Sequence, residues 1–591
     1  MDFFDFLTML GGLALFLYGM SLLGEGLSNA SGGRLERILE KLTDSPLKAV
    51  LVGAGVTAVI QSSSATTVMV VGFVNSGIMK LQQTVGIIMG ANIGTTMTSW
   101  ILGLSGINSS SFFIRMFKPT SFSPVLALVG VGILMFSKKA SQKNIAAILL
   151  GFAVLMFGMD TMSTAVKPLA GVPGFTGILT RFSHPLLGML AGTILTAIIQ
   201  SSSASVGILQ ALCVTGAISF ASAVPIILGQ NIGTCVTALL SGIGASKNAK
   251  RTALVHLYFN LIGTALFMMV FYGLNAFFRF PFLQETATPF GIATVHSTFN
   301  ITATLFLLPF SKVLTRLACL TIPERDKPET QVSAQSRILN FLDPRFLETP
   351  SYAMEQSRNV AVTMAELAAE SMNLALDLLS GYQAEKAERV RKLEAMVDQF
   401  EDALGSYLVK LSARSLSGHD SHALSIILHC IGDFERISDH ALNVVEAAEE
   451  MHTKGLSFSE KAQKELAVFI QAVRDILKLT VQSFHQEDLA LARQVEPFEE
   501  VIDGLNLDMK QRHIKRLRKG KCTIEMGFIL ADIMTNFERV SDHCSNIAVC
   551  LLEINENEFD THAYLDRLKQ EDNLDFKGKV MAYGERYQLP R

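Results

Sequence analysis

Long apolar runs separated by short polar segments dominate the chain from its start to Leu320. Seven runs are long enough, or nearly long enough, to cross a bilayer as a helix. They are 6–23, 81–104, 124–136, 145–162, 221–240, 252–271 and 289–310. The pattern therefore predicts an all-α, polytopic membrane domain over 1–320. The first run follows no basic segment and lacks a small-residue cleavage site, so we expect it to stay in the protein.

Two further apolar runs, 47–77 and 186–218, are each interrupted in the middle by the sequence Gln-Ser-Ser-Ser. Each run is typical of two half-helices that meet at the serines. A half-helix of about 14 residues is about 21 Å long, which is shorter than the bilayer core of about 30 Å. We therefore expect two re-entrant hairpins instead of complete spans.

The two interrupted runs belong to a repeat whose copies keep a constant offset in residue number. Adding 139 carries Gly12 to Gly151, Pro46 to Pro185 and Thr98 to Thr237, and it carries "GANIGTT" onto "GQNIGTC". An unbroken register over about 90 residues indicates internal duplication. We place the repeats at about 6–106 and 145–245.

The charge distribution predicts how the domain lies in the plasma (inner) membrane. With the N-terminus outside, seven crossings and two returning hairpins, 13 of the 18 Lys and Arg residues before residue 321 face the cytoplasm. In this topology three crossings separate the repeats, so the copies are inverted. The first hairpin then enters from the cytoplasm and the second from outside. Inverted repeats with broken helices are typical of secondary transporters.

A half-helix that begins inside the membrane presents unpaired backbone N–H groups and the positive end of its dipole, which attract an anion. Serine hydroxyls add donors, so two such ends can enclose a tetrahedral oxyanion. The predicted anion-binding residues are Gln61, Ser62, Ser63, Ser64, Gln200, Ser201, Ser202 and Ser203. Alternatively, these side chains hydrogen-bond only to their own helices or join neighbouring helices.

Neutral side-chain oxygens close to the serines suit a hard monovalent cation such as sodium, which would offset the charge of the anion. The candidate sodium ligands are Thr66, Asn92, Thr95, Ser205, Asn231 and Thr234.

Over residues 6–318 the paired Gln-Ser-Ser-Ser segments resemble the type II sodium-dependent phosphate cotransporter family, and "HLYFN" and "HSTFN" resemble its closing helices. The resemblance implies sodium-coupled transport of inorganic phosphate, with phosphate and sodium bound at the two serine segments. The chain departs from animal members, which continue with Thr-Ser-Thr where this sequence has Ala65-Thr66-Thr67 and Ala204-Ser205-Val206. We interpret His256 and His296 as packing and hydrogen-bonding residues.

Beyond residue 320 the composition changes. The first part has 18 Lys and Arg against 8 Asp and Glu, and totals of 50 and 53 leave 32 and 45 for the remainder. This acidic part has no interleaved aromatic residues, which argues against nucleic-acid binding. A polar linker over 321–350 precedes it. Seven cysteines form no CxxC pair, and we expect them to be reduced.

The acidic part is also duplicated, because "DFERISDHALN" from Asp433 recurs as "NFERVSDHCSN" from Asn536. Two three-helix units over 351–570, followed by a tail over 571–591, would explain this, and they resemble the PhoU family. The resemblance implies metal clusters. Paired carboxylates one turn apart on facing helices could hold a divalent metal. The candidates are Glu394, Asp398, Glu435, Asp439, Glu499, Asp503, Glu538 and Asp542. The alternative is an exposed helix face with charge pairs.

The sequence lacks the GxxxxGK[ST], HExxH and GxSxG motifs, so we expect no enzyme. The predicted function is sodium-coupled phosphate transport by alternating access, regulated by the PhoU-like domain in the cytoplasm. Two alternatives stay open: a membrane-anchored phosphate sensor and a transporter of another tetrahedral oxyanion. The direction of flux, the sodium stoichiometry and the formation of a homodimer are also open.

Overall fold

The computed structural model describes residues 3–31, 38–39, 43, 45–104, 118–137, 139–168, 172, 177, 181–323, 338–556 and 574–590. Five basic residues used for the topology lie outside these ranges: Arg34, Arg37, Lys41, Arg115 and Lys138. Residues 324–337 of the linker and 557–570 of the predicted PhoU-like domain also lie outside them. The described residues form helices and no strand, with one isolated bridge between Ser219 and Thr286. This confirms the all-α prediction.

The chain divides into two compact units, and the first comprises residues 1–332 and 343–352. Its long and half-length helices are α1 (Phe3–Ser31), α3 (Pro46–Ile60), α4 (Ser63–Asn75), α5 (Leu81–Gly103), α7 (Pro119–Phe136), α8 (Ala140–Val166), α10 (Pro185–Ile199), α11 (Ser202–Cys213), α12 (Phe220–Gly233), α13 (Cys235–Ser241), α14 (Lys247–Phe278), α15 (Pro289–Leu307) and α16 (Ser311–Thr321). Short 3₁₀ helices are η3 (Pro281–Gln284), η4 (Leu308–Phe310) and η6 (Pro344–Glu348).

The structure reproduces the predicted repeat almost residue for residue. Helices α3 and α10 begin and end at positions related by the repeat offset, and so do the starts of α4 and α11. Between the half-helices, Gln61 and Gln200 adopt left-handed backbone conformations with φ of 60° and 59°. A non-glycine residue in this region is uncommon. Its occurrence at both equivalent positions shows that the same sharp turn was duplicated.

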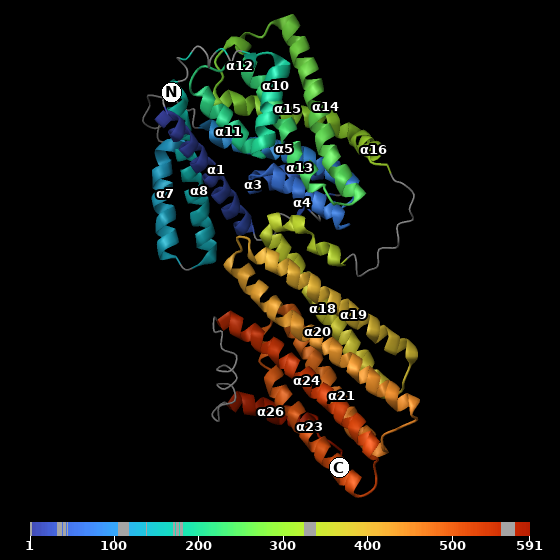
Figure 1. Ribbon diagram of the computed structural model, residues 1–591. Coiled ribbons are helices and arrows are strands. Elements are labelled where there is room, and N and C mark those ends of the chain that lie inside the picture. The colour runs from blue at the N-terminus through green and yellow to red at the C-terminus, as the bar shows by residue number, and fades with distance from the viewer. Residues whose placement is uncertain are drawn as a thin grey trace. The chain divides into compact units, whose positions relative to one another are not determined.

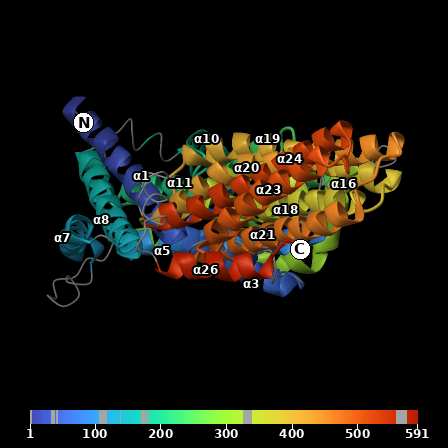
Figure 2. The ribbon, with the colours of Figure 1, turned by 90° about the horizontal axis from the view of Figure 1, so that it is seen from below.

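Equivalent helices of the two repeats pack against each other in opposite directions. A Cβ atom placed on Gly12 of α1 would lie 3.0 Å from the Gly158 carbonyl oxygen of α8, and one placed on Gly19 would lie 2.8 Å from that of Gly151. Residues further along α1 contact residues earlier in α8, so the two helices are antiparallel. They lie side by side in Figure 1 and Figure 2. Gly12 is equivalent to Gly151, and Gly19 to Gly158. The arrangement is therefore that of inverted repeats.

Six helices among the described residues are long and apolar enough to cross a membrane. The seventh predicted run lies in α7, which has 18 residues and groups with the shorter apolar helices. Helices α3, α4, α10 and α11 have 15, 13, 15 and 12 residues. These lengths fit half-spans, and re-entry of the hairpins to the side they came from stays a prediction.

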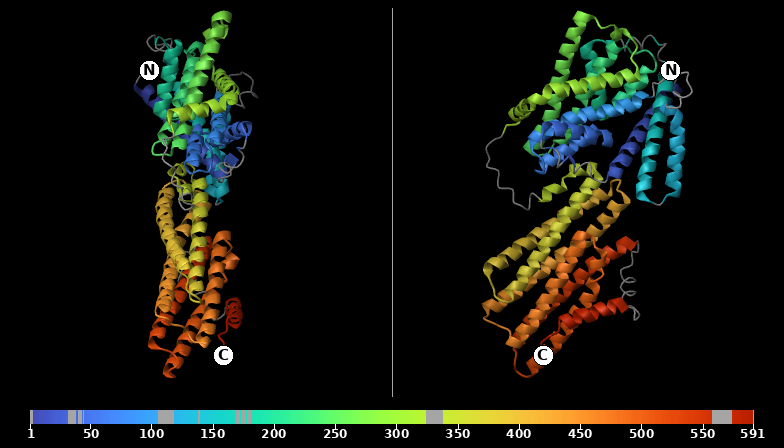
Figure 3. Two further views of the ribbon diagram at one scale, coloured as in Figure 1. Left: turned by 90° about the vertical axis from the view of Figure 1, so that its right-hand side faces the viewer. Right: turned by 180° about the vertical axis from the view of Figure 1, so that it is seen from behind.

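The second unit comprises residues 333–342 and 353–591. Its helices are η5 (Asn340–Leu342), α18 (Pro350–Leu378), α19 (Ala384–Ser412), α20 (Gly418–Thr453), α21 (Glu460–Gln486), α22 (Leu489–Ala492), α23 (Val495–Arg518), α24 (Ile524–Glu556) and α26 (Leu574–Arg586). Figure 3 shows its long helices running alongside one another. Helices α18 to α20 and α21 to α24 form the two predicted halves, and α20 packs on α24. All seven cysteines of the chain are free in the structure.

The tail contains a helix that the sequence pattern did not predict. Tyr583, in the last turn of α26, and Tyr587, directly after its end, stack on Phe498 of α23 with ring centroids 4.4 and 5.0 Å away. The hydroxyl of Tyr587 donates a 2.5 Å hydrogen bond to Asp475 of α21. The tail is therefore part of the second half of the bundle.

Candidate functional site

Each Gln-Ser-Ser-Ser segment forms a left-handed turn followed by an N-cap. The Ser62 hydroxyl oxygen accepts a hydrogen bond from the Ala65 N–H at 3.1 Å, and Ser201 accepts one from Ala204 at 3.2 Å. The first serine thus satisfies one N–H of its own helix, as the alternative interpretation requires. The N–H groups at the first two helical positions still have no acceptor within the helix, so each half-helix keeps free donors at its N-terminus.

The two half-helix N-termini converge at equivalent serines. The Ser63 and Ser202 hydroxyl oxygens are 3.4 Å apart, and the two residues are 4 % and 6 % exposed. These residues are separated by the repeat offset, so the pseudo-two-fold axis of the repeats passes between them. Two positive helix ends and two hydroxyl groups are therefore directed at one buried place, where an anion would be stabilised.

The two glutamines, although equivalent, have different surroundings. Gln61 is buried, and its Oε1 accepts a hydrogen bond from the Thr98 hydroxyl at 2.8 Å. Gln200 is exposed, and Thr237, the counterpart of Thr98, donates to the Ser64 hydroxyl at 3.3 Å instead. The first repeat is thus closed around its glutamine, whereas the second is not.

The predicted sodium ligands are all buried, and most donate their hydrogens to their own helices. Asn92 and Asn231 donate to the carbonyls of Ile88 and Ile227 at 2.9 and 3.0 Å. Hydroxyl donors are Thr66 (to Ser62), Thr95 (to Ala91) and Thr234 (to Gln230), at 3.1, 2.9 and 2.9 Å. Ser205 accepts from the Thr196 hydroxyl at 2.8 Å, as Thr66 accepts from Thr57 at 3.0 Å. A hydroxyl or amide that donates its hydrogen keeps oxygen lone pairs for a cation.

The sequence analysis did not select two buried glutamines, Gln210 in the second hairpin and Gln230 on α12. Gln230 donates to the carbonyl of Ser205 at 3.0 Å, and Gln210 donates to those of Ser99 and Pro289 at 3.0 and 2.8 Å. The Oε1 atom of each has no hydrogen-bond partner among the described residues. The sequence signal was available: the repeat offset pairs them with the apolar residues Val71 and Ala91.

The two histidines of the closing helices differ. His296 Nδ1 lies 2.8 Å from the Ser99 hydroxyl, which fits the predicted hydrogen-bonding role. His256 Nδ1 is buried and has no partner among the described residues.

The end of the linker packs against the first hairpin within the same unit; we call residues 343–352 the linker clamp. Phe346 is fully buried, with its ring 5.5 Å from that of Phe73 on α4 and 5.0 Å from that of Tyr352. Asp343 accepts a 2.6 Å hydrogen bond from Asn75 at the end of α4. Arg345 donates to the Ser241 carbonyl at 2.8 Å. The sequence analysis assigned this segment to a plain linker and missed these contacts.

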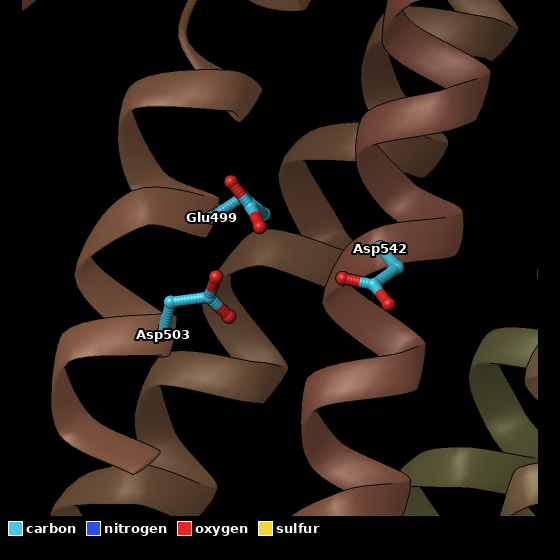
Figure 4. Close-up of side chains that lie close together, drawn as sticks. All are labelled: Glu499, Asp503 and Asp542. Atoms are coloured by element: carbon cyan, nitrogen blue, oxygen red, sulfur yellow. The ribbon is translucent and has the colours of Figure 1, made fainter. Parts of the chain in front are cut away.

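In the second unit, three predicted metal ligands come together. Glu499 and Asp503 on α23 and Asp542 on α24 each offer a carboxylate oxygen, and these atoms lie within 4.8 Å of one another. Figure 4 shows the three side chains between the two helices. Burial is the largest cause that raises the pKa of Asp503 and of Asp542, and neighbouring carboxylates add to it. Concentrated negative charge of this kind fits a divalent cation.

The remaining acidic candidates have other partners. Glu538 accepts a hydrogen bond from Asn506 and lies 3.6 Å from Lys510. In the first half, Arg436 lies 3.5 Å from Glu435 and 3.6 Å from Asp439. Burial, followed by Asp439 and Asp398, raises the pKa of Glu394. The acidic candidates of the first half therefore include both ion pairs with Arg436 and carboxylates that lie close to each other.

Histidines join the two halves of the bundle. His543 Nδ1 lies 2.8 Å from Asp433 Oδ1, and His440 Nδ1 lies 2.8 Å from Asn536 Oδ1. Asp433 and Asn536 are equivalent residues, as are His440 and His543, so the contacts form a symmetric pair between α20 and α24. The duplicated motif thus also stabilises the contact between the halves.

Models of known protein families match segments of both units. The model of the Na⁺/Pi-cotransporter family matches residues 15–164 and 154–292, and the PhoU domain model matches 361–448 and 467–551. Two bacterial relatives are similar over most of their length. "Putative inorganic phosphate export protein YjbB" of Escherichia coli (strain K12) is 25 % identical over 93 % of this chain and 97 % of that protein. "Uncharacterized protein YqeW" of Bacillus subtilis is 31 % identical over 53 % of this chain and 97 % of that protein.

A shorter segment of the chain is similar to an animal transporter. "Sodium-dependent phosphate transport protein 2A" of Rattus norvegicus is 34 % identical over 18 % of this chain and 17 % of that protein. The duplicated serine turns, the antiparallel repeats and these matches define a multi-pass membrane protein of a phosphate-transporter family. The chain belongs to the Na⁺/Pi-cotransporter family and carries a PhoU domain at its C-terminal end.

Proposed function

We propose that this protein carries inorganic phosphate across the plasma membrane, coupled to sodium, by alternating access between its two inverted repeats. The observation that carries the proposal is the meeting of Ser63 and Ser202 at the N-termini of two half-helices. Backbone N–H groups and hydroxyls there match a tetrahedral oxyanion with several acceptor oxygens. Relatives named for phosphate export and sodium-dependent phosphate transport support the choice of phosphate.

The neutral character of the serine site favours coupling to a cation. A phosphate ion moved into a buried site made of neutral donors carries uncompensated negative charge, and burial of such charge is costly. Sodium bound to nearby neutral oxygens would offset that charge. The six predicted sodium ligands lie on the helices that surround the serines, with lone pairs available. Coupling also lets either ion gradient set the direction of flux, so import and export use the same site.

The unequal glutamines support alternating access. Because the repeats have the same local sequence, each can adopt the closed arrangement that holds Gln61 or the open one that leaves Gln200 exposed. An exchange of these arrangements would move the accessible side of the site from one face to the other. Opposite conformations of equivalent repeats are what such a mechanism requires.

Labelling from each side of the membrane tests the proposed orientation. In a chain without other cysteines, Lys48→Cys should react with an impermeant thiol reagent only from the cytoplasm. Arg181→Cys should react only from outside. Both positions are exposed and lie at or just before the starts of the half-helices α3 and α10, so their accessibility reports the two hairpin entrances. Reaction of both cysteines from the same face would contradict the inverted orientation.

The linker clamp supports regulation by the PhoU domain. Its residues hold the C-terminal end of α4, and α4 carries Ser63 at its other end. The clamp continues directly into α18, the first helix of the PhoU domain. A change in that domain can therefore reach the serine site through one half-helix. Asn75 also accepts a 2.8 Å hydrogen bond from the Ser246 N–H, beside Lys247 and Lys250. These basic residues support a cytoplasmic position for the clamp and for the PhoU domain.

We further propose that Glu499, Asp503 and Asp542 hold a divalent metal. The raised pKa values of Asp503 and Asp542 mean that ionisation of these two aspartates destabilises the folded state at neutral pH, and this cost disappears as the pH falls through the raised values. Mn²⁺ or Mg²⁺ should therefore raise the Tm of the full chain at about pH 7.5 and have less effect at about pH 5. Asp542→Asn should remove the metal response, whereas Asp532→Asn, an exposed residue on the same helix, should keep it. Equal metal responses of both variants would contradict the site.

A phosphate sensor without net flux is the rival within the same fold. Counterflow of radiolabelled phosphate in proteoliposomes separates the two functions, because exchange across the membrane requires transport. The same assay with sulfate or arsenate as competitor tests the selectivity of the oxyanion site.

A further inference from the structure

One buried glutamine joins a half-helix of the second repeat to two other helices. Gln210 lies on α11, and its Nε2 atom donates to the carbonyl of Ser99 on α5 at 3.0 Å and to that of Pro289 on α15 at 2.8 Å. The side chain is fully buried. The bond to Ser99 crosses from the second repeat to the first, and the bond to Pro289 reaches a helix outside both repeats.

The fold does not require an amide at this position. The repeat offset pairs Gln210 with Val71, which is also fully buried, so the first repeat builds the same half-helix with an apolar side chain. The two carbonyls do not depend on the amide either, because a helix carbonyl also accepts from the N–H four residues further along. Gln210 Oε1 has no partner among the described residues, and burial of such an atom is costly. A costly amide that an apolar residue could replace points to a functional role.

The contacts of Gln210 lie on one side of the serine site. Gln210 is in the last part of α11, roughly 12 Å along the helix from Ser202. Ser99 is in the last turn of α5, and Pro289 is the first residue of α15. In the proposed orientation these three helix ends lie toward the outer face of the membrane. The helices are labelled in Figure 1.

Helices α5 and α15 are already joined to each other at this end. The Ser99 hydroxyl lies 2.8 Å from His296 Nδ1, and Trp100 Nε1 donates to the Ser297 hydroxyl at 2.8 Å. Helix α11 packs against both of these helices. Gln210 therefore attaches the half-helix that carries Ser202 to an assembled pair of helices.

We propose that Gln210 is a positioning residue that holds α11 against α5 and α15 and so keeps the serine site closed on the outer side. We call its two hydrogen bonds the outer latch. The proposal rests on the proposed function, in which α11 and α5, as parts of different repeats, separate in one of the two states. The latch is formed in the state described here. In the other state water reaches the amide and satisfies all of its groups, including Oε1.

Loss of the latch should favour the state that is open to the outside. Loss of the hydrogen bond between the repeats should shift the ratio of the two states at least about threefold. Phosphate from outside binds only to the open state, so its apparent affinity follows the population of that state. The half-saturating phosphate concentration should therefore fall on the outer side and should not fall on the cytoplasmic side. A residue that only stabilises the fold would not produce this difference between the sides.

A substitution that keeps the length of the side chain tests the latch. Gln210→Met removes both hydrogen bonds. The matched control is Thr193→Val, which removes a hydrogen bond to the Gly229 carbonyl at 3.1 Å. That bond also runs from a side chain to a helix carbonyl, but it joins α10 to α12 inside the second repeat. Uptake of radiolabelled phosphate into right-side-out and inside-out membrane vesicles gives the half-saturating concentration on each side.

A cysteine between α11 and α5 reports their separation directly. Ala211 is 2 % exposed and belongs to the same buried cluster as Leu102 of α5. In a chain without other cysteines, Ala211→Cys should therefore react slowly with an impermeant thiol reagent while the latch is formed. The reagent is added at the face from which Arg181→Cys reacts, so the test does not depend on which face that is.

Gln210→Met should raise the labelling rate of Ala211→Cys at least about threefold and lower the half-saturating phosphate concentration on that face. Thr193→Val should match the parent in both measurements. Unchanged labelling and unchanged phosphate affinities in a folded Gln210→Met chain would overturn the latch and leave Gln210 as a packing residue. If the Met variant does not fold, Gln210→Val, which installs the residue of the first repeat, gives the same test with the same two outcomes.

Labelling and flux separate this inference from the proposed function. A parent chain that moves no phosphate, but whose labelling rises in Gln210→Met, would keep the latch and contradict transport. A parent chain with sodium-driven flux and an unaltered Gln210→Met variant would contradict the latch alone.

Discussion

Replacement of both central serines in the double variant Ser63→Ala/Ser202→Ala is expected to abolish measurable phosphate transport while the protein stays folded. Each hydroxyl that donates to a phosphate oxygen contributes about 1.5 to 3 kcal/mol, since hydrogen bonds to charged groups are the stronger ones. Loss of two such donors raises the half-saturating phosphate concentration by at least about 100-fold. Each single variant should raise it by at least about tenfold. The measurement is uptake of radiolabelled phosphate against concentration in proteoliposomes.

The sequence provides a matched control for these variants. Thr67 is buried one turn after Ser63, donates to the Ser63 carbonyl at 2.8 Å, and has Val206 as its counterpart in the second repeat. Thr67→Val therefore installs what the second repeat already has, and transport should persist. Ser62 and Ser201 are less suitable for this test, because they cap their helices and their loss would also lower stability. Unchanged phosphate affinity of the Ser63 and Ser202 variants would contradict the paired-serine site.

Loss of the linker clamp is expected to free transport from control by the PhoU domain. Phe346→Ala removes a fully buried ring, which typically costs about 3 to 5 kcal/mol and is enough to detach the segment from Phe73. The variant removes the contact between the clamp and α4 but leaves the serines of α4 in place, so phosphate flux should continue. Any dependence of flux on divalent metal at the PhoU domain should disappear. Phosphate counterflow with and without Mn²⁺ measures both properties.

Two further variants, a control substitution and a shortened chain, help to interpret this result. Phe310→Ala, an exposed phenylalanine of the same unit, should leave flux and its metal dependence as in the parent. A chain ended after Lys327 lacks both the clamp and the PhoU domain, and it should resemble Phe346→Ala. If Phe346→Ala keeps full metal dependence, control reaches the repeats through α16 alone. If the shortened chain is folded and monodisperse but neither binds nor moves phosphate, the PhoU domain is part of the transport mechanism.

Much of the membrane unit could be predicted because local sequence sets it. The constant repeat offset located the half-helices, and the Gln-Ser-Ser turn with its capping hydroxyl is a local structure that both copies form alike. Gly12 and Gly151 helped to reveal the repeat, but the sequence did not show that such glycines bring α1 and α8 into close contact. The contact between Ser63 and Ser202 follows from the inverted symmetry once both turns exist.

The features that the sequence analysis missed depend on contacts between distant segments. The clamp on α4 joins Asp343 to Asn75 and Phe346 to Phe73, and no periodicity in a linker shows such pairs. The α26 helix packs on α23 through two tyrosines in a segment that reads as a polar tail. Gln210 and Gln230 were visible only as departures from repeat symmetry.

Phosphate flux driven by an imposed sodium gradient tests the central claim most directly. Proteoliposomes with the full chain receive radiolabelled phosphate on both sides and Na⁺ on one side only, with choline at equal ionic strength on the other. Coupled transport predicts net phosphate movement away from the sodium side and reversal when the gradient is reversed, and the Ser63→Ala/Ser202→Ala variant should show neither. Phosphate exchange that is the same with and without Na⁺ would contradict sodium coupling. No exchange under any gradient, from protein that binds phosphate, would make the chain a sensor.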